Sequence, residues 1–353
     1  MPTFWQDKKV LVTGHTGFKG SWLSLWLRLL KADVTGYSLA PLTHPNLFEA
    51  AHIEREIKSL IGDIRDFNHL QSAVLKARPQ IIFHLAAQPL VRASYANPLE
   101  TYSSNVMGTA HILEAARQCK SVKAVVIVTT DKCYENREWV WGYRENDPMG
   151  GDDPYSSSKG CAELVTQAYQ RSYFNSNSVG IASARAGNVI GGGDWAEDRL
   201  IPDFIKSLAA KQKIVLRNPL ATRPWQHVLE PLGGYLQLAE KLWDEPAKYT
   251  GAWNFGPEES DVRSVQWVVE YMAHLWDEAL PWELDKQAQP HEAQLLKLDC
   301  SKAHFHLNWK PKWSLETALQ QTVDWYQAFN QQNISMQAVC LRQIHDYMEN
   351  QSK

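Results

Sequence analysis

Short apolar runs alternate with longer amphipathic stretches along the chain from residue 8 onward. The apolar runs are rich in Val and Ile and show little polar alternation, which is typical of strands buried on both faces of a parallel sheet. They are KKVLVTG, DVTGYSL, PQIIFHLA and VKAVVIVTT, and the helix-like stretches lie near residues 19–31, 66–77 and 97–118. This order predicts βαβ units and an α/β fold built on a doubly wound parallel sheet.

The pattern continues through a helix expected over 154–174 and the strand VGIASARAG, and it changes near residue 190. The later part is rich in Gly, Pro and Trp and has shorter elements, so we expect a first domain over 1–187 and a smaller, loop-rich lobe over 188–353. Segments around 225–260 are expected to return to the first domain, with GAWNFG as the returning strand. Residues 294–327 predict a strand, a short helix and a closing helix, and the last twenty or so residues predict an amphipathic helix of unknown role.

Composition narrows the class of protein. The 353 residues are 44% hydrophobic, which supplies a core for one or two domains, and the net charge of −3 gives no bulk reason to expect nucleic acid or a membrane as partner. The N-terminus lacks the features of a signal peptide, and no apolar stretch is long enough to span a bilayer. Five scattered cysteines without a CxxC pair disfavour both a disulfide framework and a zinc site. We therefore expect a cytoplasmic protein without a metal.

Three glycines follow the first predicted strand. Gly14, Gly17 and Gly20 are three residues apart in GHTGFKG, at a strand-to-helix junction. Glycines there permit a tight turn and close backbone approach, so that the amides of the helix face a pyrophosphate. The context favours a dinucleotide site over an ordinary turn, and it predicts a Rossmann-type domain whose turn includes Thr16 and Phe18.

Other cofactor-binding candidates follow the later strands. No acidic residue follows the second strand, so the sequence does not distinguish NAD from NADP. Asp63 follows the third strand, where it either approaches the adenine or caps a helix. The small side chains in HLAAQ either let the backbone pass close to the cofactor or serve packing alone. The candidates from these segments are Asp63, Ile64, Leu85, Ala86, Ala87, Gln88 and Thr129.

Tyr155 and Lys159 lie four residues apart at the start of a helix that Asp153 and Pro154 introduce. Residues at this spacing share a helix face, which allows the ammonium to lie near both the phenol and the cofactor ribose. A tyrosine with a pKa of about 10 is a poor base until a nearby cation stabilises its phenolate. The pair is therefore predicted to be catalytic.

The strand VKAVVIVTTDKCYEN carries Thr130, Asp131 and Lys132 beyond its carboxyl end, where open α/β sheets bind ligands. Thr130 is suited to hold a sugar hydroxyl and Asp131 to protonate a leaving group, with Lys132 acting beside them. A plain strand ending with a capping turn is the alternative. Because Tyr155 and Lys159 are also present, we count all three among the catalytic candidates.

Several motifs together resemble the extended short-chain dehydrogenase/reductase family, and within it the CDP-glucose 4,6-dehydratases. They are GHTGFKG, HLAAQPLV, NVMGT, TTDKCYEN, PYSSSK, RAGNVIGGGDW and TRPWQHV, and the likeness covers nearly the whole chain. Related TDP-sugar dehydratases have Glu in place of Lys132, and sister epimerases lack Asp131 and its neighbour. The resemblance implies CDP-D-glucose as substrate, CDP-4-dehydro-6-deoxy-D-glucose as product, and a bound NAD with no net turnover. It also implies a homodimer or homotetramer and a route to dideoxy sugars of bacterial surface polysaccharide.

The resemblance also implies a mechanism. Tyr155, its pKa lowered by Lys159, takes the C4 hydroxyl proton as hydride passes to the nicotinamide. The C4 ketone acidifies the C5 proton, whose removal, with Asp131 protonating the C6 hydroxyl, expels water before the hydride returns to C6. Lys132 is either the C5 base, which requires desolvation or nearby cations, or a cation that stabilises the enolate.

The second lobe is expected to hold the nucleotide, because guanidinium groups suit a pyrophosphate. Arg223 is the leading candidate, whereas Arg199 and Arg217 are explained equally well as surface ion pairs. Trp195 and Trp225 are the candidate stacking groups. The substrate-binding candidates are Gln88, Asn188, Arg199, Arg217, Arg223 and Trp225.

Other readings remain open. A nucleotide-sugar epimerase or reductase would use the same glycine turn and the same Tyr155 and Lys159. A GDP-mannose or TDP-glucose dehydratase would differ only in base recognition. A dinucleotide-binding regulator or scaffold would bind cofactor without turnover, which the intact catalytic candidates argue against.

His304 and His306 lack a third metal ligand, His15 is expected to pack locally, and Cys133 has no pattern of a nucleophile.

Overall fold

A seven-stranded parallel sheet forms the centre of the computed structural model, which describes residues 2–174, 178–277, 281–285, 295–331 and 333–349. The strand order is β11-β6-β5-β4-β1-β2-β3, and each neighbouring pair is parallel. The predicted α/β, doubly wound class is confirmed. The strands of the sheet are β1 (Lys9–Thr13), β2 (Asp33–Ser38), β3 (Lys58–Ile61), β4 (Ile81–His84), β5 (Ala124–Val128), β6 (Gly180–Ala186) and β11 (Gly251–Phe255).

Burial explains why the strands lack polar alternation. Every residue of β4, β5 and β6 is buried, whereas most of the edge strand β3 is exposed. Successive residues of one strand contribute to opposite faces: Val10 and Val12 belong to one hydrophobic cluster, and Leu11 belongs to the other. The sheet therefore has a core on each side, as a parallel sheet with helices on both faces requires.

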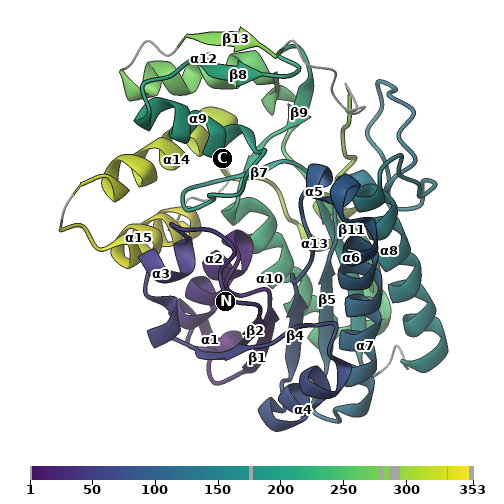
Figure 1. The fold of residues 1–353 in the computed structure, drawn as a ribbon. Coiled ribbons are helices and arrows are strands. Elements are labelled where there is room, and N and C mark those ends of the chain that lie inside the picture. Colours follow the sequence, from purple (N-terminus) through teal and green to yellow (C-terminus); the bar gives the residue numbers. More distant parts are fainter. Residues whose placement is uncertain (1, 175–177, 278–280, 286–294, 332, 350–353) are drawn as a thin grey trace.

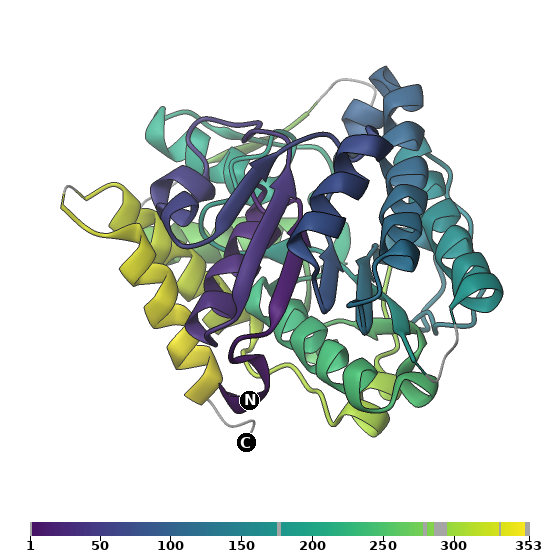
Figure 2. The same cartoon turned by 90° about the horizontal axis from the view of Figure 1, so that it is seen from below.

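Helices cover both faces of this sheet (Figure 2). On one face lie α2 and α10, with α15 packed outside α2; on the other lie α4, α7 and α8. The main helices are α2 (Phe18–Leu29), α4 (Phe67–Ala77), α5 (Val91–Ala96), α6 (Pro98–Tyr102), α7 (Gly108–Gln118), α8 (Pro154–Tyr173), α9 (Leu200–Ala209), α10 (Leu229–Asp244), α12 (Val265–Trp276), α13 (Ser301–Leu307), α14 (Leu315–Phe329) and α15 (Met336–Glu349). A π-helical turn at 103–107 joins α6 to α7, so the helix expected near 97–118 is continuous but not regular.

A smaller set of elements lies above the sheet and includes α9, α12, β8 (Ile214–Leu216) and β13 (Trp282–Leu284) (Figure 1). Short strand pairs brace this region: β7 (Val189–Ile190) with β10 (Gln226–His227), β9 (Thr222–Pro224) with β12 (Val262–Ser264), and β8 with β13. The remaining short helices are α1 (Pro2–Trp5), α3 (Leu47–Ala50) and α11 (Pro246–Tyr249), with 3-10 turns at Ile53–Arg55, Asp131–Cys133 and Glu259–Asp261.

The chain returns to the sheet as expected at GAWNFG, because β11 pairs with β6 along the edge. The short helix and closing helix predicted after residue 300 are α13 and α14, which confirms them. The strand predicted before them is reduced, in its described part, to a single bridge between Tyr143 and Leu298. The division at residue 187 remains a prediction.

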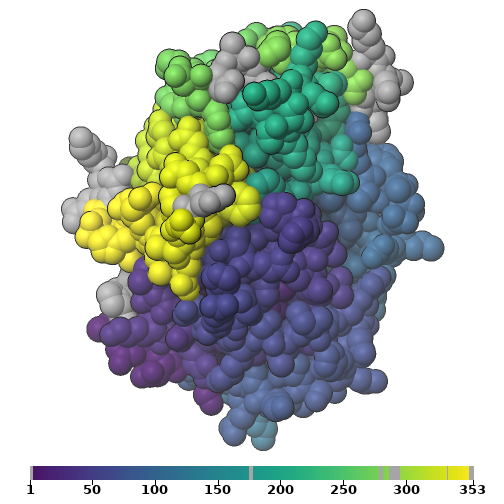
Figure 3. Space-filling view, turned by 60° about the vertical axis from the view of Figure 1, so that its left-hand side comes forward, coloured from purple at the N-terminus to yellow at the C-terminus, as the bar shows by residue number. Residues whose placement is uncertain are grey.

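The role of the predicted C-terminal helix is visible in the structure. Helix α15 packs against α2, so that the two ends of the chain lie side by side (Figure 3). The rings of Trp26 and Tyr347 meet edge to face at 5.5 Å, and the Tyr347 hydroxyl donates to Glu230 Oε2 at 2.8 Å. The helix therefore closes the core on the α2 side. Residues 350–353 lie outside the described part.

The glycine turn after β1 is tightly packed. Gly14 has φ +77°, a conformation that favours glycine, and a Cβ there would lie 2.7 Å from the Ala86 nitrogen. A Cβ on Gly20 would lie 2.1 Å from the Gly14 carbonyl oxygen, which leaves no room for one. At Gly17 the corresponding distance is an ordinary 3.4 Å. The turn thus needs glycine at positions 14 and 20 for reasons of space.

Gly20→Ala is expected to separate α2 from the turn and lower the free energy of unfolding by about 1–3 kcal/mol, as overpacking does. Gly17→Ala, in the same turn, is the matched control and should change stability much less. Urea unfolding followed by circular dichroism measures both variants. Equal losses for the two would contradict this explanation of the turn.

Candidate active site

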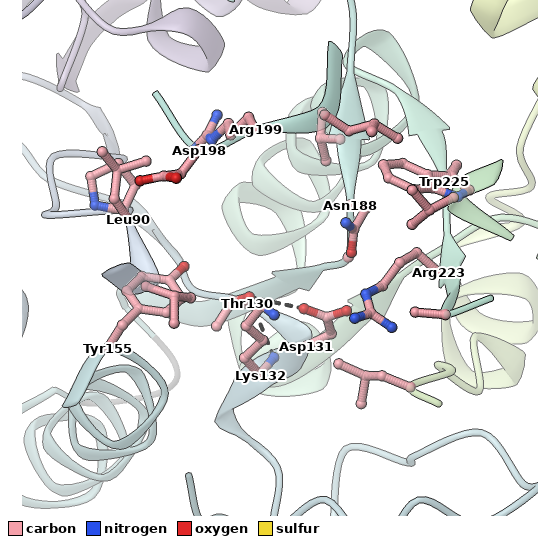
Figure 4. A pocket seen from close by; sticks show the side chains of 18 of the residues that line it. Leu90, Thr130, Asp131, Lys132, Tyr155, Asn188, Asp198, Arg199, Arg223 and Trp225 are labelled. Atoms are coloured by element: carbon pink, nitrogen blue, oxygen red, sulfur yellow. Dashed lines mark hydrogen bonds between the residues drawn. The ribbon is translucent and has the colours of Figure 1, made fainter. Parts of the chain in front are cut away.

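A cavity of about 360 Å³ lies between the carboxyl ends of the central strands and the smaller set of elements above them. Polar side chains from both sides line it (Figure 4). It brings together these predicted site residues: Thr129, Thr130, Asp131, Lys132, Tyr155, Asn188, Arg199, Arg217, Arg223 and Trp225. Segments far apart in sequence therefore meet at one site.

Helix α8 presents Tyr155 to the cavity from its first turn. As predicted, Asp153 caps the helix: its carboxylate accepts from the Ser156 amide at 2.9 Å and from the Ser156 hydroxyl at 2.6 Å. Pro154 occupies the first helical position, where no amide is needed. The Tyr155 amide donates to Ser94 Oγ at 3.1 Å, which ties the start of the helix to α5. The phenol is thus held by local structure on the wall opposite Arg223.

The two members of the Tyr–Lys pair have different surroundings. Burial raises the pKa of Tyr155 to about 12, while a hydrogen bond with Thr130 and the charge of Arg199 act to lower it. Lys159 donates to the Val128 carbonyl at 3.2 Å, and burial lowers the pKa of its ammonium to about 8. The sequence led us to expect Lys159 as the cation that lowers the pKa of Tyr155. In the structure its ammonium reaches the last carbonyl of β5 instead.

Thr130, Asp131 and Lys132 form a compact turn after β5. The Thr130 hydroxyl donates to Asp131 Oδ1 at 2.9 Å and accepts from the Lys132 amide at 3.3 Å. Asp131 is 2% exposed, and its Oδ2 has no hydrogen-bond partner among the described residues. Burial raises the pKa of Asp131, while the charges of Lys132 and Arg223 oppose that rise. A buried carboxyl of raised pKa that faces a cavity is suited to donate a proton.

The residues above the sheet differ in how they meet the cavity. Arg223 points toward Asp131 and donates to the Thr222 carbonyl at 2.9 Å (Figure 4). Trp225 lines the cavity while its indole NH donates to the Arg263 carbonyl at 3.1 Å. Both side chains are buried, as residues that shape a binding wall would be.

For Arg199 and Arg217 the sequence left two roles open, binding of the nucleotide and formation of an ion pair. Arg199 lines the cavity and pairs with Asp194 at 2.8 Å, and Arg217 lines it while pairing with Asp198 at 3.5 Å. Each guanidinium is thus in an ion pair and also borders the cavity.

Several predicted residues lie outside the cavity lining. The Gln88 side chain bonds with the Leu90 backbone and with Thr101 Oγ1, which explains its place in the loop without a ligand. Trp195 packs edge to face against Tyr326 at 5.1 Å, away from the cavity. Its expected stacking role is not supported by this position, because the ring serves the contact with α14.

The predicted cofactor residues gather at the glycine turn and the neighbouring strand ends. Helix α2 begins without a side-chain cap, so its first amides are available to an anion. The Ala86 amide donates to Thr13 Oγ1 at 3.2 Å, and Thr16 Oγ1 donates to the Leu39 carbonyl at 2.9 Å. Phe18 begins α2, and Leu85 and Ala87 flank Ala86 beyond β4. This arrangement fits a dinucleotide.

Asp63 does not cap a helix. Its carboxylate forms a two-point ion pair with Arg65, which lowers the pKa of Asp63, and Asp66 caps α4 by accepting from the His69 amide at 3.0 Å. The capping alternative for Asp63 is therefore wrong. Ile64 is buried, and its carbonyl bonds with His111 Nδ1 at 2.8 Å.

A buried network beneath the cavity was missed by the sequence analysis. Glu163 accepts from Thr129 Oγ1, from Ser183 Oγ at 2.6 Å and from Arg185 Nη2 at 2.8 Å. Arg185 also donates to the Tyr134 hydroxyl at 2.7 Å. The sequence contained a signal for this network, because Arg185 is the one charged residue of its strand and Glu163 lies four residues after Lys159.

Lys19 was also missed. It lines the cavity from the second position of α2, within the glycine turn itself. A lysine inside a glycine turn was a signal available in the sequence.

The remaining expectations concern side chains outside this cavity. His15 is buried, bonds with Ser59 Oγ at 2.7 Å and meets Phe48 edge to face, so its expected packing role is confirmed. Burial raises the pKa of the Cys133 thiol.

Within the described part of the chain, no three His, Cys, Asp or Glu side chains cluster as metal ligands. No helix of that part has the length and apolar character needed to cross a bilayer.

A family model and two proteins of known function, all of them 4,6-dehydratases, match most of the chain. The model of the family described as GDP-mannose 4,6 dehydratase matches residues 11–322. The CDP-glucose 4,6-dehydratase of Salmonella typhimurium is 55% identical over 350 residues, which are 98% of this chain and 97% of that protein. The dTDP-D-glucose 4,6-dehydratase of Mus musculus is 28% identical over 327 residues, or 90% and 88% of the two chains.

Solved structures share the fold. The dTDP-glucose 4,6-dehydratase of Bacillus anthracis, in complex with NAD, has a TM-score of 0.75 at 23% identity and covers 90% of this chain and 96% of its own. The UDP-glucose 4-epimerase of Thermotoga maritima, with UDP-glucose, has a TM-score of 0.78 at 21% identity, with coverages of 91% and 99%.

The burial of the Glu163–Arg185 ion pair leads to a prediction about the free energy of unfolding. Arg185→Met leaves a buried carboxylate without its cation and is expected to cost about 3 kcal/mol of unfolding free energy. Adding Glu163→Gln to the same chain removes the unpaired charge and should recover part of that loss. Denaturant unfolding of the two single variants and the double variant measures the coupling. Strictly additive losses would show that the pair does not act as a unit.

Proposed function

This chain belongs to the GDP-mannose 4,6 dehydratase family, and we propose that within it the chain acts as a CDP-D-glucose 4,6-dehydratase. The observation that carries the proposal is the identity of 55% over 98% of the chain to a CDP-glucose 4,6-dehydratase. The cavity supports it, because Thr130, Asp131, Lys132 and Tyr155 all line it. The reaction converts CDP-D-glucose to CDP-4-dehydro-6-deoxy-D-glucose and water.

The cofactor of this proposal is NAD. The uncapped N-terminus of α2 and the close backbone at Gly14 and Gly20 fit its pyrophosphate, and Asp63 and Ile64 are the residues that we propose for its adenosine half. When bound, NAD supplies a hydride acceptor for C4 and a hydride donor for C6. Thr129, Ala86 and the Tyr155–Lys159 pair would border its nicotinamide half.

In the proposed mechanism Tyr155 accepts the proton of the C4 hydroxyl. Burial raises the pKa of this phenol to about 12, and the Thr130 hydrogen bond and the Arg199 charge oppose that rise. Thr130 orients the sugar through its hydroxyl. Lys159 holds the cofactor ribose from the same helix face.

Asp131 is the proposed acid for the C6 hydroxyl. Its raised pKa favours the protonated form, and its unpartnered Oδ2 is the atom available to deliver that proton. The C6 oxygen then leaves as water while the C5 proton is removed. Lys132, next to Asp131 and only half-buried, takes the C5 proton or stabilises the negative charge that its removal leaves.

The nucleotide is proposed to bind to the second lobe. Arg223 and Arg217 suit its diphosphate, and Asn188 and Trp225 complete the wall that faces the sugar and base. We retain the division into a cofactor domain over 1–187 and a mainly substrate-binding lobe over 188–353 as part of this proposal.

Location and assembly complete the proposal. All five cysteines are free thiols, which supports a reducing cytoplasm. Exposed apolar side chains on the π-helical turn, α6 and α8, namely Met107, Leu99 and Leu164, support a homodimer or homotetramer formed through these helices.

A panel of sugar nucleotides tests the function. The protein is incubated with NAD and CDP-, TDP-, UDP- or GDP-hexoses, and the masses of the products are measured by mass spectrometry. We expect loss of one water from CDP-glucose alone. Tyr155→Phe is the control and should lower that rate by about 10²–10⁴, as the loss of an acid–base group does. Water loss from another nucleotide would reassign the base, and an isomer of unchanged mass would indicate an epimerase.

Lys132→Ala separates oxidation from elimination. If Lys132 acts on the C5 proton, the variant still oxidises C4 but no longer exchanges the C5 proton with solvent. The measurement is deuterium incorporation at C5 in D₂O together with cofactor absorbance under single turnover. Normal exchange in the variant would remove Lys132 from this step.

A further inference from the structure

The loop over residues 135–148 borders the cavity but has no part in the proposed mechanism. It follows the catalytic candidates at the end of β5, and a bridge between Tyr134 and Met149 closes it at its base. Compact loops whose ends meet in this way are frequently functional. Two of its residues, Asn136 and Glu138, line the cavity.

Stacked aromatic rings give this loop a defined shape. The ring of Trp139 stacks on that of Tyr143 with centroids 5.3 Å apart, and Tyr143 stacks on Tyr134 at 5.2 Å. Beneath the stack, the Arg185 guanidinium lies 4.8 Å from the centroid of the Tyr134 ring. Because Arg185 is paired with Glu163, the loop is held by the same buried ion pair that joins α8 to β6.

The Asn136 side chain fixes the backbone at Glu138. Its Oδ1 accepts from the Tyr143 hydroxyl at 3.0 Å and from the Glu138 amide at 3.0 Å, and its Nδ2 donates to the Leu295 carbonyl at 3.2 Å. Glu138 has φ +50°, a left-handed conformation that is uncommon for residues other than glycine. Backbone outliers of this kind cluster at ligand sites, where the surrounding structure holds them in place. Here the conformation is held where a carboxylate borders the cavity.

We infer that Glu138 binds the hexose of the sugar nucleotide, and that Asn136 and Tyr143 position it. The inference rests on the proposed function, which brings a hexose to this cavity. A carboxylate repels a diphosphate, whereas its two oxygens accept hydrogen bonds from two neighbouring hydroxyl groups. Since C4 and C6 of the hexose react in the proposed mechanism, the C2 and C3 hydroxyls are the neighbouring pair available to Glu138.

The test compares binding of CDP-glucose with binding of CDP, which lacks the hexose. Kd is measured by calorimetry with NAD present, in a Tyr155→Phe background in which turnover is slow. We expect Glu138→Ala to weaken CDP-glucose binding about 10-fold, as loss of a hydrogen bond to a charged group does, and to change CDP binding less than twofold. Glu135→Ala is the matched control, because Glu135 is exposed on the same loop and lies outside the cavity lining.

Tyr143→Phe tests the positioning role, because it keeps the stacked ring and removes only the hydroxyl that holds Asn136. We expect a smaller loss of CDP-glucose affinity, and no further loss when Tyr143→Phe is added to Glu138→Ala. Thermal unfolding checks that each variant folds. Losses that multiply in the double variant would show that Tyr143 does not act through Glu138.

CDP-glucose affinity of Glu138→Ala within twofold of the unsubstituted background would overturn the inference. So would equal losses for CDP-glucose and CDP, because the contact would then be to the ribose or the base. If wild type binds CDP-glucose without dehydrating it, the proposed function fails while these affinities still decide the role of Glu138. If wild type binds no nucleotide-linked hexose, both proposals fail together.

Discussion

The buried ion pair of Glu163 and Arg185 is the interaction on which the active site depends. It joins α8, which carries Tyr155 and Lys159, to β6, and a third bond to Thr129 joins both to the end of β5. Each partner would be costly to bury alone, so the three elements have one arrangement in which both charges are satisfied. The position of the phenol relative to Thr130 and Asp131 follows from that arrangement.

The cavity that results has an uneven distribution of charge. Asp131 is buried just after β5 with a raised pKa, and the charges of Lys132, of Arg223 on β9 and of Lys19 on α2 oppose that rise. Parallel strands end at the same edge of a sheet, so the fold brings together groups that are far apart in sequence. Asp194 and Asp198, which also line the cavity, form ion pairs with Arg199 and Arg217.

Much of this could be predicted from the sequence because it is local. The glycine turn, the Asp153 cap with Pro154, and the spacing of Tyr155 and Lys159 depend on residues within one helical turn of each other, and the structure has each element where it was expected. Predictions that required a distant partner were weaker. Nothing local indicates that Trp195 meets Tyr326 or that α15 covers α2. Gln88 does not line the cavity, and its side chain bonds with Thr101 on α6, a contact that the sequence did not indicate.

The sequence did contain one indication of a long-range contact, namely charged residues at positions that the fold must bury. Strand β6 reads GIASARA, and an arginine in a strand buried on both faces requires an acidic partner from a covering helix. Helix α8 follows β5 and precedes β6, so by the rules of βαβ connection it covers them. On its buried face the one acidic residue is Glu163, one turn beyond Lys159 and on the same face. The pairing of Arg185 with Glu163 was therefore deducible in principle, and with it the orientation of α8 that presents Tyr155 to the cavity.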